Sequence, residues 1–239
     1  MERENVKVIL WGLGAMGRGM AEMLLTKKGV DIVGVVGRGA KIGKSMYEFL
    51  DVERGNREDV KIGAFEDVIK EGSADVVLIA TDSFTRNAFD KIKYCLERKI
   101  NVVSTAEEMA YPKAQEPELA KELDRIAKEN GVTVLGTGIN PGLIMDLLVV
   151  TLTGACMDVD HIKAERVNNL SPFGPAVMHE QGVGIPVDEF NSRVAEGTLA
   201  GHVGFSESVN MISDALGWKL SDKVKQTKEA IVSKVYRKA

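Results

Sequence analysis

The stretch ILWGLGAMGRGMAEMLL, residues 9–25, places Gly12, Gly14 and Gly17 between an apolar run and a helix-like pattern. This G-x-G-x-x-G spacing, after a strand and before a helix, is typical of a dinucleotide-binding turn. Gly12 would permit the tight turn, Gly14 would let a pyrophosphate approach the backbone, and Gly17 would let helix and strand pack closely. The free N–H groups that would face the phosphates belong to Ala15 and Met16. The sequence therefore predicts a nucleotide site, with a merely tight turn as the alternative.

Short apolar runs rich in β-branched residues alternate with helical patterns along the first half of the chain. Near-continuous runs such as VVLIA suit strands buried on both faces, and the alternation predicts right-handed βαβ units on a parallel sheet. Helices are expected at 84–98 and 116–130. The expected strands are Val6–Trp11, Ile32–Val36, Val60–Ile62, Asp75–Ala80, Ile100–Ser104 and Val132–Leu135. This pattern predicts an α/β fold, a Rossmann-type doubly wound parallel sheet.

The texture of the sequence changes after Leu135, which places a domain boundary near residues 136–142. We expect an NAD(P)-binding domain at 1–138 and a second, α+β substrate or dimerisation domain at 139–239. In the second domain DHIKAERV, residues 160–167, alternates like a strand with one exposed face. The following NLSPFGPAVMHEQGVGIP predicts a long loop, and GFSESVNMISDALGW predicts an amphipathic helix.

Composition excludes several function classes. The chain has 239 residues and a formal net charge of -4, with basic and acidic residues interspersed, so we expect no nucleic-acid partner. The charged start lacks the apolar core of a secretion signal, and no apolar run is long enough to span a membrane. We therefore expect a cytoplasmic protein without a membrane partner. Cys95 and Cys156 are expected to be free thiols, and the three histidines, without metal-ligand spacing, to be surface or hinge residues.

The cofactor preference follows from the end of the second strand. An acid that binds the ribose hydroxyls is expected about 20 residues after the glycines. Counting from Gly12 leads near Asp31, which begins that strand and so lies at the wrong end of the sheet. Arg38 stands where the acid would be, and a guanidinium there suits a 2′-phosphate. We expect NADP or NAD, with NADP favoured and Lys41 and Lys44 assisting, unless these cations are ordinary solvated loop charges.

Polar residues follow the later strands at their carboxyl ends, where ligands of open parallel sheets bind. After the fourth strand, Thr81, Asp82 and Ser83 could contact the cofactor or cap the next helix. Asn140, in GTGINPG, could hydrogen-bond a polar substrate or belong only to a turn.

Two adjacent carboxylates, Glu107 and Glu108, follow the fifth strand. One of them could take a proton from a substrate ammonium, or from the water that attacks an imine. Burial would raise its pKa toward a useful range. The alternative is that both are helix-start acids favoured by the helix dipole.

Five segments spread over the chain together resemble the 2,4-diaminopentanoate dehydrogenase family, which is related to dihydrodipicolinate reductases and native amine dehydrogenases. They are WGLGAMGRGMAEMLL, NVVSTAEEMAYP, GTGINPGLIMDLL, LSPFGPAVMHEQGVG and GHVGFSESVNMISDALGW. The resemblance implies NAD(P)-dependent oxidative deamination of 2,4-diaminopentanoate, a small diamino acid, to 2-amino-4-oxopentanoate, ammonia and reduced cofactor.

The resemblance also implies roles for residues. A glutamate after this strand is the base in related amine dehydrogenases, and the motif falls on Glu107 or Glu108, of which Glu108 is favoured. Asn140 and the loop Ser171–Gly184 would hold the α-amino acid end. Charge complementarity alone suggests that Arg166 pairs with the substrate carboxylate.

The chain departs from the family in length. Family members usually run well beyond its end, so we expect an incomplete second domain, and unpaired strand edges would favour a homodimer. The alternatives are a dihydrodipicolinate reductase-like imine reductase and a catalytically inactive NAD(P)-binding module. The first of these has a more similar length, but its paired-histidine and KxDAPSGTA-type segment has no match here.

Overall fold

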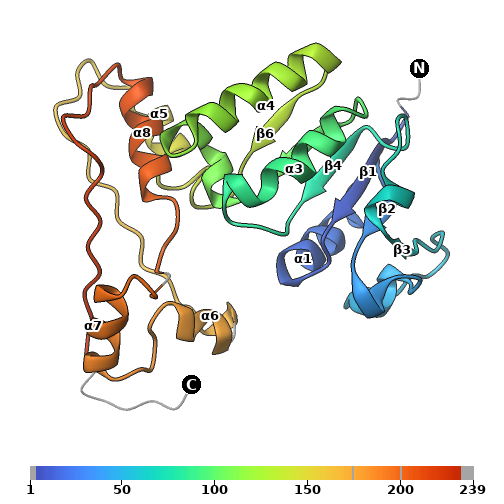
Figure 1. Ribbon diagram of the computed structural model, residues 1–239, viewed down its shortest axis with the longest axis horizontal. Coiled ribbons are helices and arrows are strands. Elements are labelled where there is room, and N and C mark those ends of the chain that lie inside the picture. The colour runs from blue at the N-terminus through green and yellow to red at the C-terminus, as the bar shows by residue number, and fades with distance from the viewer. Residues whose placement is uncertain (1–3, 174, 200, 233–239) are drawn as a thin grey trace.

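A computed structural model describes residues 4–173, 175–199 and 201–232 (Figure 1). Six strands of this described part form one sheet in the order β3-β2-β1-β4-β5-β6, and every pairing is parallel. The strands are β1 Val6–Trp11, β2 Val30–Val36, β3 Ile62–Gly63, β4 Val76–Ile79, β5 Asn101–Ser104 and β6 Val134–Gly136. The predicted doubly wound parallel sheet is confirmed, with shifts of one or two residues at most strand ends.

Helices cover both faces of the sheet. They are α1 Ala15–Leu24, α2 Phe65–Val68, α3 Thr85–Leu96 and α4 Pro117–Asn130, with 3-10 turns η1 Gly39–Lys41, η2 Met46–Phe49, η3 Glu107–Ala110 and η4 Pro112–Ala114. Strand β1 sends Ile9 and Trp11 into a core shared with α3 and α4, and Val8 and Leu10 into a core shared with α1 and η2. Burial on both faces explains the near-continuous apolar strands.

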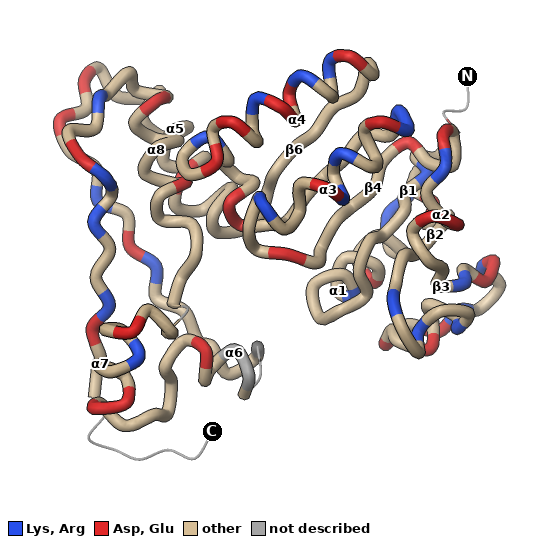
Figure 2. Tube along the Cα trace, viewed as in Figure 1, with Lys and Arg blue, Asp and Glu red and all other residues tan. Residues whose placement is uncertain are grey.

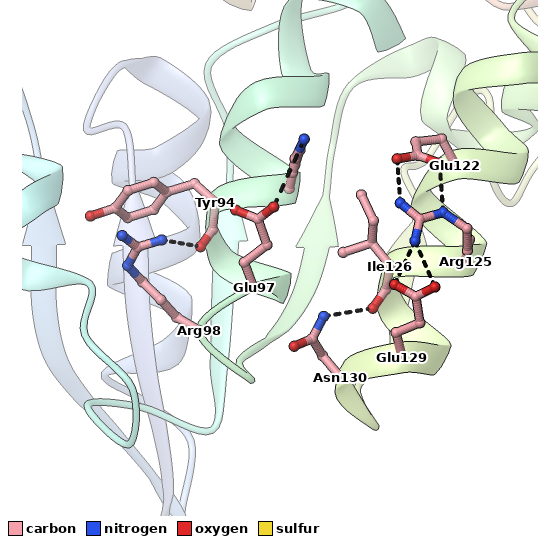
Figure 3. Close-up of polar contacts among 9 residues, drawn as sticks. Tyr94, Glu97, Arg98, Glu122, Arg125, Ile126, Glu129 and Asn130 are labelled. Carbon is pink, nitrogen blue, oxygen red and sulfur yellow. Dashed lines mark hydrogen bonds and ion pairs between the residues drawn. The ribbon is translucent and has the colours of Figure 1, made fainter.

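Acidic and basic residues alternate along α4 (Figure 2). Arg125 there lies between Glu122 and Glu129, with N–O distances of 2.6 and 2.5 Å (Figure 3). Exposed pairs one turn apart contribute only a few tenths of a kcal/mol each, roughly 0.3–0.5. The helix ends at Gly131, whose φ of 67° is the left-handed conformation that glycine adopts easily.

The regular elements in the described part of the second half are helices, joined by long segments without regular structure (Figure 1). The helices are α5 Leu147–Thr153, η5 Ser171–Phe173, α6 Pro175–Glu180, α7 Val187–Ala195 and α8 Phe205–Ala215. The strand expected at 160–167 is wrong, because this segment finds no ladder partner in the described chain. The loop expected at 169–186 instead folds into η5 and α6. Residues 174 and 233–239 lie outside the described residues.

Both cysteines are free, Cys95 buried and Cys156 exposed, as expected. Within residues 4–232, gaps excepted, no helix has the length and apolar character needed to cross a membrane.

Two glycine-to-alanine changes should affect stability in opposite directions. At Gly136, a Cβ atom would lie 1.6 Å from the carbonyl oxygen of Met109, so Gly136→Ala should cost about 1–3 kcal/mol by overpacking. At Gly19, inside α1, a Cβ would meet nothing within 4 Å, so Gly19→Ala should stabilise by about 0.5–1 kcal/mol. Urea unfolding of both variants measures the two effects, and a stable Gly136→Ala variant would contradict the packing of β6 against η3.

Candidate functional site

The three glycines after β1 have three different environments. Gly12 has a φ of 103°, and a Cβ there would lie 2.6 Å from Cγ2 of Thr81. A Cβ on Gly17 would lie 1.9 Å from the carbonyl oxygen of Gly12, whereas a Cβ on Gly14 would meet nothing within 4 Å. Gly14 is also the N-cap of α1 and makes no side-chain cap, which leaves the first N–H groups of α1 without that partner. These environments match turn, close packing and ligand approach, the roles expected of Gly12, Gly17 and Gly14.

A cavity of about 540 Å³ opens beside this turn, at the carboxyl ends of β1, β2 and β4. Its lining includes the predicted cofactor residues Arg38, Thr81 and Asp82. Lys41 also lines it, with its Nζ donating to the carbonyl oxygen of Leu13 at 2.7 Å. The open position at Gly14, the uncapped helix and the nearby cations fit a dinucleotide with its phosphates at the helix N-terminus. Lys44 is outside this lining.

The position of the alternative ribose acid is also clear. Asp31 pairs with Lys7 in the register of β1 and β2, and it accepts a hydrogen bond from Asn5 at 3.1 Å. It therefore lies at the amino end of the sheet, away from the glycine turn.

A second cavity of about 380 Å³ adjoins the first, because both are lined by Ala80, Thr81 and Asp82. Its lining also includes Met16, Ser83 and Glu107. Neither Asp82 nor Ser83 caps α3, whose N-cap is Phe84 without a side-chain cap. Asp82 instead pairs with Lys91 at 2.5 Å.

The two adjacent glutamates of η3 have different surroundings. Glu107 is half-buried and faces the second cavity. Glu108 is buried; its Oε2 accepts from the N–H of Thr85 at 2.8 Å and its Oε1 accepts from Gln115 at 3.2 Å. The N–H of Glu108 donates to the carbonyl oxygen of Ser83 at 3.1 Å. Glu108 thus holds the start of α3, and it lines neither cavity.

A third cavity, of about 590 Å³, lies in the second half and contains both predicted substrate residues, Asn140 and Arg166. The ring of His202 also lines it, with Nε2 3.3 Å from Nδ2 of Asn140. Burial and the positive charge of Arg166 lower the pKa of His202, so its ring is neutral at pH 7. The Oδ1 atom of Asn140 is buried and has no partner, which leaves one acceptor for a ligand.

His202, expected to be a surface or hinge residue, lies in the loop before α8 and lines the third cavity. The ring is half-buried and packs edge-on against Phe205, with ring centroids 4.7 Å apart. The spacing of the three histidines gave no sign of this position, although His202 is the second residue of the motif GHVGFSESVNMISDALGW. In the part of the chain that the structure describes, no three His, Cys, Asp or Glu side chains gather as a metal site would require.

Comparisons find relatives for both halves of the chain. Residues 6–137 match the oxidoreductase family with an NAD-binding Rossmann fold, and residues 143–239 match the 2,4-diaminopentanoate dehydrogenase C-terminal domain. A 2,4-diaminopentanoate dehydrogenase from Acetoanaerobium sticklandii is 69% identical over 236 residues, which cover 99% of this chain and 67% of that protein. An amine dehydrogenase structure from Mycobacterium smegmatis is 28% identical with a TM-score of 0.71, covering 92% of this chain and 64% of that one. The chain thus spans about two thirds of the length of these relatives.

The open position at Gly14 gives a test of the cofactor turn. Gly14→Ala should leave the melting temperature unchanged, because Gly14 has an ordinary φ of -86° and space around it. The added methyl group would meet a bound pyrophosphate at a cost of about 1–3 kcal/mol, which weakens dinucleotide binding about 10- to 100-fold. Energy transfer from Trp11, which lines the cavity, to the reduced nicotinamide measures the affinity.

Gly19→Ala, in the same helix and also in open space, is the matched control and should bind normally. Equal affinities of the Gly14→Ala and Gly19→Ala variants would contradict the placement of the phosphates.

Proposed function

The chain belongs to the 2,4-diaminopentanoate dehydrogenase family, and we propose that it catalyses the NAD(P)-dependent oxidative deamination of 2,4-diaminopentanoate. The products are 2-amino-4-oxopentanoate, ammonia and NAD(P)H, with one water consumed. The observation that carries this proposal is the carboxylate of Glu107 in a cavity that shares three lining residues with the cofactor cavity. The alternatives are a dihydrodipicolinate reductase-like enzyme and an inactive NAD(P)-binding module.

The proposed chemistry needs a base beside the nicotinamide. Bound NAD(P)+ supplies the hydride acceptor. Before the hydride leaves the carbon that bears the amine, the ammonium must lose a proton, so that the nitrogen lone pair can assist. Water then adds to the iminium carbon and also loses a proton. A single carboxylate can accept the proton in both steps.

We assign this base to Glu107, in place of Glu108, which the family resemblance favours. The half-buried side chain of Glu107 reaches a cavity that a substrate could enter. Both carboxylate oxygens of Glu108 already accept hydrogen bonds, from Thr85 and Gln115. A carboxylate held in this way by a helix start and a buried amide is poorly placed to exchange protons with a ligand.

The amino acid end of the substrate would occupy the third cavity. The guanidinium of Arg166 would pair with its carboxylate, and the free Oδ1 of Asn140 would accept from its α-ammonium. Because the ring of His202 is neutral, it does not repel that ammonium. Of the loop Ser171–Gly184, which the family resemblance places here, Gln181 lines the cavity.

We also propose that NADP is preferred over NAD. Arg38 lines the cofactor cavity at the end of β2, and Asp31 lies at the opposite end of that strand. A 2′-phosphate would form charge-assisted hydrogen bonds with the guanidinium.

The activity test mixes the chain with 2,4-diaminopentanoate and either dinucleotide, and follows the absorbance of the reduced cofactor. Glu107→Gln should lower kcat by about 100- to 10,000-fold, because the amide cannot accept a proton. Glu108→Gln should lower it far less, since its side-chain oxygen can still accept from Thr85.

Other outcomes would contradict the assignment of the base or the proposed function. The reverse order of the two variants would return the base to Glu108. Cofactor binding without amine-dependent reduction of the cofactor would favour the inactive NAD(P)-binding module. Turnover of dihydrodipicolinate in place of the diamine would favour the reductase-like enzyme.

A charge reversal tests the cofactor preference. Arg38→Asp should weaken NADP binding about 10- to 100-fold, the value of hydrogen bonds to one charged group, and leave NAD binding nearly unchanged. Lys44→Asp is the control, because it makes the same charge change at a lysine outside the cavity lining. Titration of Trp fluorescence with each dinucleotide gives the affinities, and equal losses for NADP and NAD would refute the role of Arg38.

A further inference from the structure

The first turn of α8 carries two buried polar side chains, Glu207 and Ser208. Ser208 donates to Oδ2 of Asp146 at 2.8 Å, and the same oxygen accepts from the N–H of Gly142 at 2.8 Å. Gly142 belongs to the loop of Asn140 after β6. Through Ser208, α8 is therefore tied to the loop that would bind the substrate.

Glu207 ties the same helix turn to η3. The amide nitrogen of Gln115 donates to Oε1 of Glu207 at 2.7 Å and to Oε1 of Glu108 at 3.2 Å. Glu108 in turn holds Ser83 and Thr85, which flank the second cavity. A series of hydrogen bonds thus runs from α8 to Ser83, which lines the second cavity together with Glu107.

These hydrogen bonds bring the two buried carboxyl groups of Glu108 and Glu207 to the one amide of Gln115, without a cation to compensate their charge. Across the described residues, no Lys or Arg forms an ion pair with Glu108 or Glu207. The Oε2 atom of Glu207 is buried and has no hydrogen-bond partner, and Glu207 is 0% exposed. An unpartnered charged oxygen at such a site is costly, whereas a neutral carboxyl group costs much less.

Other titratable groups lie on the elements packed around Glu207. They are Glu108 on η3, Lys113 on η4, Tyr111 between η3 and η4, Asp146 before α5, and Asp214 on α8 itself. Lys113 is engaged with Asp214 at 2.6 Å, at the other end of α8. Burial raises the pKa of Glu207 and outweighs the lowering effect of hydrogen bonds from Gln115 and from its own backbone, and the negative charge of Glu108 raises this pKa further.

We propose that Glu207 is a positioning residue: it keeps a proton and, through Gln115 and Glu108, fixes η3 and therefore Glu107 relative to the substrate loop. The positioning role rests on the proposed function, because it concerns the same base. A neutral Glu207 shares the amide of Gln115 with Glu108, and a negative charge on Glu207 would weaken this bridge. Loss of the proton would loosen η3 by repulsion between the two carboxylates.

The sign of the pH effect follows from linkage. Because the folded-state pKa of Glu207 is raised above its unfolded value, the folded chain binds the extra proton between these two values. The stability that depends on this proton is complete below the unfolded pKa and is lost as pH rises through the folded pKa. Glu207→Gln mimics the neutral acid and needs no proton.

The experiment measures urea unfolding of the full chain between about pH 5 and about pH 8. Relative to the original chain, Glu207→Gln should become more stable as pH rises. Asp214→Asn, the same acid-to-amide change on the same helix, is the control. Hydrogen bonds from Lys113 and Tyr111 lower the pKa of Asp214, so its contribution is lost only in more acidic solution and Asp214→Asn should leave the pH slope of this window unchanged. A pH slope that Glu207→Gln leaves unchanged would overturn the proposal.

Two further readouts separate positioning from simple stability. The infrared band of a protonated carboxyl group should be present in the original chain and absent in Glu207→Gln. Hydrogen exchange of residues 104–115 should be faster in Glu207→Ala and normal in Glu207→Gln. In the amine assay Glu207→Ala should lower kcat on the order of 100-fold, as misplacement of a reacting group does, with an unchanged KM for the dinucleotide, and Glu207→Gln should restore kcat.

Failure of the proposal and failure of the proposed function are distinguishable. An original chain without amine-dependent turnover contradicts the function, and the infrared and exchange measurements still decide whether Glu207 keeps a proton and fixes η3. If the original chain is active but Glu207→Gln lowers kcat as much as Glu207→Ala does, the result contradicts the positioning role of Glu207 and leaves the proposed function intact.

Discussion

The parallel direction of the described strands is the constraint on which the site depends. In a parallel ladder every strand ends at the same edge, so the loops after β1, β2, β4, β5 and β6 are brought together there. The glycine turn, Arg38, Thr81, Glu107 and Asn140 each follow one of these strands. An antiparallel arrangement of the same segments would place alternate loops at opposite edges and separate the cofactor residues from the base.

The sequence predicted the features that depend on local backbone requirements. Gly12, Gly14 and Gly17 were recognisable because a positive φ, an open approach and a close packing contact each demand glycine at a fixed spacing. The position of Asp31 was also readable, because it follows from counting along a strand. Such inferences need no knowledge of which distant segment packs nearby.

The inferences that failed or remained open concern tertiary partners. Glu107 and Glu108 are neighbours on a 3-10 turn, where successive side chains point about 120° apart, and only Thr85 and Gln115 reveal which one is engaged. The alternation at 160–167 is compatible with a strand, but a strand needs a partner, and the described chain offers none. The environment of His202 depends on Arg166 and Asn140, which are far from it in sequence.

The contact between the two halves shows why polar groups are used where apolar ones would be more stable. An apolar contact between α8 and η3 would bury area without fixing direction, and such surfaces can slide. The hydrogen bonds of Glu207, Gln115 and Glu108 require defined distances and so set one register between helix and turn. Replacing a buried polar cluster by well-packed apolar residues is often neutral or stabilising, so stability alone does not explain it. A site that must hold a base next to a substrate loop benefits from the fixed register, which is the property that the buried acids supply.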